Sequence, residues 1–189
     1  MLDIHERLDK ILDLIQGESF LAGKGLGNDI GFYIFDYDPK EELVVRDHVK
    51  FLKDKLNTNT SPTKIIEFDL YELLLGILKS ESVLEQIANL EAERGSEYIL
   101  EAIRDLASPE VYVSLIDGKT EESQIVFLTG IGKVWPIVRS HNILNNLHHI
   151  LENIPVVMFF PGIFDGTGLR LFGKIDDDNY YRAFPLVAK

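Results

Sequence analysis

The stretch IVFLTGIGKVWPIVRSHNILNNLHHILE, residues 125–152, decides the fold. Its first four residues are apolar, which is typical of a strand buried on both faces. The turn Gly130-Ile131-Gly132-Lys133 follows at once. Pro136 then stands where a helix can begin, and we expect that helix to run to about Glu152. A strand, a tight turn and a helix make one α/β unit.

The rest of the chain repeats this alternation of strands and helices. Apolar runs predict further strands at 30–35, 65–68 and 156–160, the last closed by Pro161-Gly162. Alternation at 169–171 and 181–185 predicts two antiparallel strands at the end of the chain. The helices expected from apolar spacing are 2–15, 43–56, 71–80, one beginning with Ser82 and Glu85 as a capping box, 97–107, and a short one beginning at Ser108-Pro109-Glu110.

This order of elements predicts an α/β fold with a mostly parallel central sheet flanked by helices and with antiparallel strands at its carboxyl-terminal end. We expect a single domain over residues 1–189, because no linker or repeat interrupts the pattern. The unit at 125–152 also looks like the strand and helix that carry sensor residues in P-loop ATPase folds. That likeness suggests a degenerate relative without the phosphate loop and rests on fold analogy alone.

The composition excludes several kinds of function. The chain has no cysteine, which excludes disulfides, thiolate zinc sites and cysteine nucleophiles. A net charge of −12 predicts against direct DNA binding, which depends on Lys and Arg neutralising phosphates. The amino-terminal MLDIHERLDKILDLIQ contains acidic residues and no unbroken apolar run, so it predicts neither a signal peptide nor a membrane span. We therefore expect a cytoplasmic protein.

Glycine-rich stretches invite a nucleotide-binding interpretation. The glycines at 23–31 precede a strand, whereas a phosphate loop follows a strand and opens a helix. Gly130, Gly132 and Lys133 are weaker candidates for cofactor binding, because backbone N–H groups between a strand and a helix can face an anion. They lack the four-residue spacer and the Ser or Thr after the lysine. The sequence therefore predicts a tight turn and no cofactor.

Catalytic chemistry has little support in the sequence. Asp36 and Asp38 follow a strand end, where two carboxylates could hold Mg²⁺ for a metal-dependent hydrolase. A turn ahead of Pro39 explains the same two residues and is the favoured interpretation. No Ser or Thr stands in a nucleophile elbow, and no other carboxylate pair is placed for acid–base work. We therefore expect no metal, no catalytic residue and no enzymatic activity.

The helix expected from Pro136 has an unusually polar face. Its members are Arg139, His141, Asn142, Asn145 and Asn146. The seven-residue spacing of His141 and His148 does not match the four-residue spacing with which a helix binds zinc. This face is either an internal hydrogen-bond network or a contact for a partner, and the sequence leaves both open. A second candidate contact consists of Tyr180, Tyr181 and Arg182, because aromatics and arginine are enriched at binding hot spots.

Several motifs in the second half of the chain occur together in one known family. They are Leu128-Thr129-Gly130, Pro136, Arg139 to Asn146, Phe160-Pro161-Gly162, Leu169 to Gly173 and Asn179 to Phe184. Through them the chain resembles the BrxB family, a small component of the BREX bacteriophage-exclusion systems. The resemblance extends close to full length, with a looser match in the amino-terminal half.

The resemblance implies a place in a multi-protein machine that methylates host DNA and blocks phage replication. BrxB has no assigned chemistry in such a system, so the implied role is that of an assembly or adaptor subunit. Its partners would be other BREX proteins, first of all the PglZ-like protein of the phosphatase family. The alternative function is a degenerate nucleotide- or nucleic-acid-sensing module that acts through Lys133 and Arg139.

Overall fold

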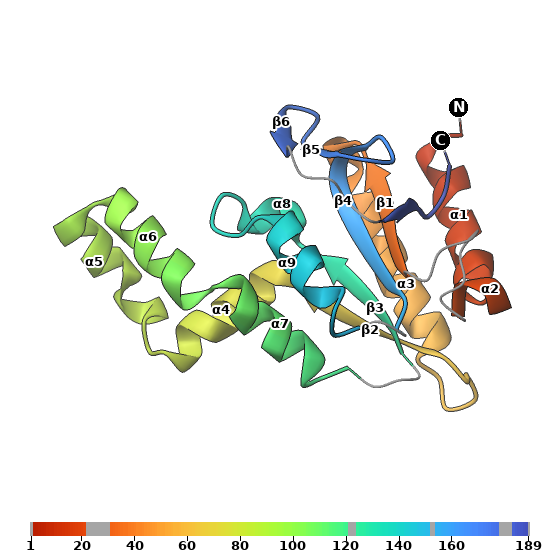
Figure 1. The fold of residues 1–189 in the computed structure, drawn as a ribbon, viewed down its shortest axis with the longest axis horizontal. Helices are drawn as coiled ribbons and strands as arrows, with labels where there is room; N and C mark the ends of the chain where they lie inside the picture. The colour runs from red at the N-terminus through yellow and green to blue at the C-terminus, as the bar shows by residue number, and fades with distance from the viewer. Residues whose placement is uncertain (1, 22–30, 121–123, 152–153, 178–182, 189) are drawn as a thin grey trace.

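The computed structural model describes residues 2–21, 31–120, 124–151, 154–177 and 183–188. A parallel sheet lies at its centre. The strands of this sheet are β1 (Phe32–Tyr37), β2 (Lys64–Asp69), β3 (Gln124–Thr129), β4 (Val156–Phe164) and β7 (Phe184–Pro185). Their order in space is β2-β3-β4-β1-β7, and each neighbouring pair is parallel (Figure 1). The predicted mostly parallel sheet is confirmed.

Helices cover both faces of the sheet. The helices α1 (Ile4–Ile15), α2 (Glu18–Leu21) and α3 (Glu42–Leu56) pack on one face, against Tyr33, Phe35 and Tyr37 of β1. A short 3-10 turn, η1 (Pro39–Glu41), leads into α3. Phe32 and Ile34, which alternate with those residues, point into the core of the opposite face. This two-sided burial explains why β1 is an unbroken apolar run up to Asp36.

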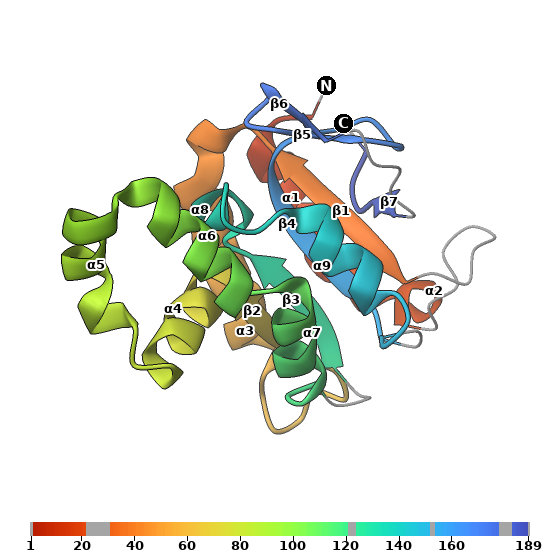
Figure 2. The same ribbon diagram turned by 60° about the vertical axis from the view of Figure 1, so that its left-hand side comes forward.

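The second face carries the helices that connect β2 with β3 and β3 with β4 (Figure 2). They are α4 (Leu70–Ser80), α5 (Ile87–Arg94), α6 (Ser96–Leu106), α7 (Pro109–Asp117), α8 (Ile131–Val134) and α9 (Ser140–Leu147). Helices α5 and α6 reach away from the sheet, and α5 contains no buried residue. The helix predicted from Ser108-Pro109-Glu110 is confirmed as α7.

The capping box expected at Ser82 and Glu85 is wrong. Ser82 has a φ of 57°, in the left-handed region, whereas an N-cap residue has an extended backbone. A 3-10 turn, η2 (Leu84–Gln86), leads into α5 instead, and neither element has a side-chain cap. Local backbone geometry thus overrides a sequence pattern that normally marks a helix start.

The single long helix expected from Pro136 is also wrong. The chain forms α8 before the proline and α9 after it, with residues 135–139 between them. Trp135 is extended, with φ −68° and ψ 137°, and the Trp135–Pro136 peptide bond is cis. A residue that precedes proline is sterically disfavoured in the helical region, so Pro136 ends one helix instead of opening the next.

The carboxyl-terminal strands differ in detail from the prediction. Strand β4 continues through Pro161 and Gly162, which were expected to close it, and forms an antiparallel hairpin with β5 (Leu169–Leu171). The strand β6 (Ile175–Asp177) pairs antiparallel with β5. The antiparallel ending is therefore confirmed, but its second strand is β6. Phe184 and Pro185, placed in that strand by the prediction, form β7 beside β1.

Gly162 allows β4 to pass close to the neighbouring strand. A Cβ atom at this position would lie 2.2 Å from the carbonyl oxygen of Arg170 and 2.8 Å from a ring carbon of Phe160. We expect Gly162→Ala to lower the free energy of unfolding by about 1–3 kcal/mol, as overpacking does. Gly76→Ala is the matched control, because its Cβ would meet nothing within 4 Å on helix α4. Urea unfolding should show that variant unchanged or slightly stabilised, whereas equal stability of both variants would contradict the tight packing.

His48 on α3 predicts a pH dependence of stability. Burial lowers the pKa of His48, partly offset by Asp9 and the backbone of Leu8, and its Nε2 is buried without a hydrogen-bond partner among the described residues. Because the folded state disfavours the protonated ring, the unfolded chain binds the proton more tightly. The resulting stability is present above the unfolded pKa of about 6.5 and is lost as the pH falls below it.

We expect the urea midpoint of the wild type to decrease between about pH 7.5 and 5.5, and that of His48→Leu to decrease less. The comparison of the two slopes isolates this one histidine from the rest of the chain. Parallel slopes would show that protonation of His48 is not linked to folding.

Candidate functional site

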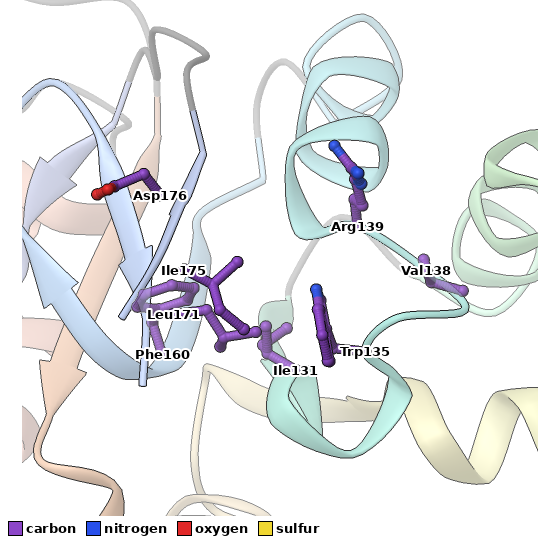
Figure 3. Close-up of a pocket in the computed structure, with 8 residues that line it drawn as sticks. All are labelled: Ile131, Trp135, Val138, Arg139, Phe160, Leu171, Ile175 and Asp176. Atoms are coloured by element: carbon purple, nitrogen blue, oxygen red, sulfur yellow. The ribbon is translucent and has the colours of Figure 1, made fainter. Parts of the chain in front are cut away.

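A groove lies between the β5–β6 hairpin and the segment that joins α8 to α9 (Figure 3). Its cavity has a volume of ≈ 110 Å³. The lining residues are Ile131, Trp135, Val138, Arg139, Phe160, Leu171, Ile175 and Asp176. Most of them are apolar, so the groove offers hydrophobic contact, with charged groups near it.

Trp135 and Arg139 form the α8–α9 side of this groove (Figure 3). Trp135, the chain's single tryptophan, is 41% exposed. Arg139 is exposed, and its guanidinium has no hydrogen bond or ion pair with any residue that the structure describes. Asp176 lies on the hairpin side, where its carboxylate accepts from Nε of Arg170. Tryptophan and arginine are the side chains most enriched at binding hot spots.

The predicted polar face divides into two kinds of residue. Asn146 donates from Nδ2 to the backbone carbonyl of Asn142 at 2.7 Å, within α9 itself. His141 is half-buried and has contacts of its own. Arg139 and Asn145 face solvent. Asn146 is exposed as well, so the outward groups of the face are Arg139, Asn145 and Asn146, and both interpretations of the face stay open. Tyr180, Tyr181 and Arg182 lie outside the described residues.

The space beside the glycine turn after β3 is occupied by the Asp69 carboxylate and the Phe172 ring. Gly130 adopts a left-handed φ of 74°, and a Cβ there would lie 2.2 Å from Oδ1 of Asp69. Asp69 also accepts from the Nζ of Lys133 and caps the start of α4. A Cβ at Gly132 would lie 2.8 Å from the ring of Phe172. An anion at this turn would meet the Asp69 carboxylate, which is unfavourable. The geometry therefore agrees with the predicted tight turn and not with an anion site.

Asp36 and Asp38 have separate structural roles. Arg7 donates to Asp36 twice, from Nη1 to the backbone oxygen at 2.6 Å and from Nη2 to Oδ1 at 3.0 Å. The other carboxylate oxygen accepts from the backbone N–H of Phe164 at 3.0 Å. Asp38 is exposed and accepts from the N–H of Lys40 at the start of η1. One carboxylate is thus buried in an ion pair and the other is a cap, which supports the turn interpretation.

A larger cleft of ≈ 400 Å³ lies beside α3 at the carboxyl ends of the parallel strands. Glu67 accepts there from Nζ of Lys53 at 2.6 Å and from the hydroxyl of Thr129 at 2.8 Å. The Tyr37 hydroxyl donates to Glu42 at 2.6 Å, and burial together with this bond raises the pKa of Tyr37. Sequence reasoning missed Glu67, Asp69 and Thr129, although polar residues that end buried strands are a signal that could have found them.

Among the described residues, no group of three or more His, Asp or Glu is placed to hold a metal ion, and no helix is long and apolar enough to cross a membrane.

Comparison with known proteins identifies the family. A family model with the description "BREX protein BrxB" matches residues 66–186. The chain belongs to the BrxB family. Two curated BrxB proteins also match, and no solved structure does. The analogy with P-loop ATPase folds therefore stays a prediction.

The two BrxB relatives match nearly the whole chain. A BREX protein BrxB from Bacillus cereus (strain H3081.97) is 51% identical over all of both chains. The BrxB from Escherichia coli O9:H4 (strain HS) is 32% identical over 96% of this chain and 90% of its own. The predicted resemblance to BrxB is confirmed, and with it membership of the BREX phage-defence system. A BREX component implies other BREX proteins as partners.

Proposed function

We propose that this BrxB protein is a non-catalytic assembly or adaptor subunit of its BREX system. It binds another BREX protein through the groove between α8–α9 and the β5–β6 hairpin, and the PglZ-like phosphatase-family protein is the first partner to test. The observation that carries the proposal is the exposure of Trp135 beside Arg139, whose guanidinium has no ion pair among the described residues. An aromatic and an arginine at the rim of an apolar groove are typical of interface centres.

The hairpin next to the groove adds apolar surface. Ile163 on β4 is 43% exposed and Phe172 in the β5–β6 turn is 36% exposed. Grouped apolar side chains on the surface of a protein mark interaction sites more often than scattered ones do. Ile163 and Phe172 line a separate cleft with Tyr37 and Pro39, so the hairpin carries apolar surface outside the groove as well.

The carboxylates at the carboxyl edge of the sheet form internal ion pairs, which supports a role without catalysis. At the carboxyl edge of the sheet, Asp36 is held by Arg7, Asp69 by Lys133 and Glu67 by Lys53. A general acid or base needs a carboxylate that can reach a substrate proton. These three carboxylates are instead used in internal ion pairs.

Co-purification tests the proposal. The chain is expressed with each neighbouring BREX gene product in turn, captured by a tag and analysed by size-exclusion chromatography. We expect a discrete complex with the PglZ-like protein. If no BREX protein forms a complex with this chain, the adaptor role is wrong.

The alternative is nucleotide or nucleic-acid sensing through Lys133 and Arg139. The ion pair of Lys133 with Asp69 argues against it, because the lysine is already neutralised. Titration of ATP and of duplex DNA at low salt tests it directly, since phosphate contacts are strongest there. Binding that is lost in Arg139→Gln would favour this alternative, and the absence of binding would remove it.

A further inference from the structure

A second cleft opens beside Arg139 and shares Val138 and Arg139 with the groove. It has a volume of ≈ 270 Å³ and lies between α6, α7 and α9. Arg104 near the end of α6, and Arg139 with Asn142 at the start of α9, provide its polar lining. The remaining lining residues are alanine, isoleucine, valine and prolines. Two guanidinium groups and one amide thus face a cavity with apolar walls.

The charge of this cleft is opposite to that of the protein. The chain has a net charge of −12, but none of the described residues that line the cleft is acidic. Asp105 and Glu110, the acidic neighbours of the cleft in sequence, are exposed and do not line it. The first turns of α7 and α9 border the cleft, and the partial positive charge of helix amino termini adds to that of the arginines.

The two arginines differ in how they are held. Arg104 donates from Nη2 to the backbone oxygen of Pro136 at 2.9 Å, which fixes the guanidinium against the segment that leads to α9. Arg139 has no hydrogen bond or ion pair within the part of the chain that the structure describes. A fixed arginine opposite one with free donors is suited to an oxyanion, because a guanidinium matches a carboxylate with two parallel N–H donors.

We propose that this cleft receives one carboxylate of an acidic segment of a partner protein, held between Arg104 and Arg139 with the Asn142 amide as a further donor. The role of the partner rests on the proposed adaptor function, but the ligand chemistry does not. A polyanion such as DNA would be repelled by the acidic surface around the cleft, whereas one carboxylate needs only local complementarity. The volume also falls below the range of about 300–1,000 Å³ of small-molecule sites.

An acidic peptide is the direct probe. The peptide acetyl-Gly-Glu-Glu-Gly-amide is titrated at low salt and followed by the fluorescence of Trp135, which is near Arg139 and is the single tryptophan. We expect saturable binding that Arg104→Gln and Arg139→Gln each weaken by about tenfold. Arg94→Gln, an exposed arginine on α5 outside the cleft, should bind like the wild type. Arg139→Gln breaks no described contact, so it tests the site even if Arg104→Gln perturbs the fold.

The results separate this inference from the proposed function. An absence of peptide binding, equal binding by all variants, or binding of inorganic phosphate in preference to the peptide would overturn the carboxylate site. Co-purification with the PglZ-like protein that is unaffected by either substitution would also overturn it, while leaving the adaptor role intact. Peptide binding that depends on both arginines supports the site even if no BREX partner is found, in which case only the adaptor role fails.

Discussion

Replacing Arg7 with methionine is expected to lower the free energy of unfolding by about 3–5 kcal/mol, the usual cost of leaving one member of a buried ion pair without its partner. Arg7 is 5% exposed and Asp36 is 3% exposed. Arg7 also donates to the backbone oxygen of Val187 at 3.3 Å, and its guanidinium lies 4.6 Å from the centre of the Phe35 ring. The substitution therefore removes contacts to two parts of the chain at once, strand β1 and the segment at Val187.

Urea unfolding followed by circular dichroism measures this effect. Lys10→Met is the matched control, because Lys10 is exposed on the same helix α1, and it should change stability by less than about 0.5 kcal/mol. Adding Asp36→Leu to Arg7→Met should recover part of the loss, since the uncompensated buried charge is then gone. A loss below about 1 kcal/mol for Arg7→Met would mean that water reaches the pair and screens it.

The double substitution Trp135→Ala with Arg139→Ala is expected to abolish phage protection by the BREX system and to prevent the complex with the partner protein. Truncation of hot-spot residues typically costs about 2 kcal/mol or more of binding energy each. The melting temperature should fall by no more than about 2–4 °C, which corresponds to about 1 kcal/mol in a protein of this size. Plating efficiency of phage, co-purification and thermal melts give the three readouts.

A control pair lies on the other side of the sheet. Phe51 and Arg46 are also exposed, on α3, so Phe51→Ala with Arg46→Ala removes an aromatic and an arginine of similar accessibility. We expect this variant to protect cells like the wild type. Full protection by the Trp135 and Arg139 variant would exclude the groove as the contact. Unfolding of that variant would assign both residues to the internal structure.

The fold was largely predictable from the sequence. The spacing of apolar residues along an element shows which of its sides are buried. Phe32 and Ile34 point to one core and Tyr33 and Phe35 to the other, so a continuous apolar run could only be an inner strand. Pro136 was misplaced because proline is compatible with a helix start and with a helix end. The extended backbone of Trp135 in the folded chain selects the second possibility.

The candidate site was less predictable because it depends on residues that are far apart in the sequence. Arg139 was found from the polar face of its helix, but Arg104 lies on α6 and reaches the same cleft only after the chain has folded. Asp69 and Lys133 likewise meet across 64 positions of sequence, which makes the lysine unavailable to a phosphate. Periodicity reports on one element at a time and carries no information about such pairs.

The position of Arg7 also makes the fold depend on contacts between distant parts of the sequence. Its acceptors lie on β1 and at Val187, which is 180 positions later in the sequence. Helix α1 packs in the same core as Leu186 and Val187. Helix α1 therefore acquires its full set of contacts only after β1 and residues 186–187 have joined the fold, so contacts of great sequence separation complete the core.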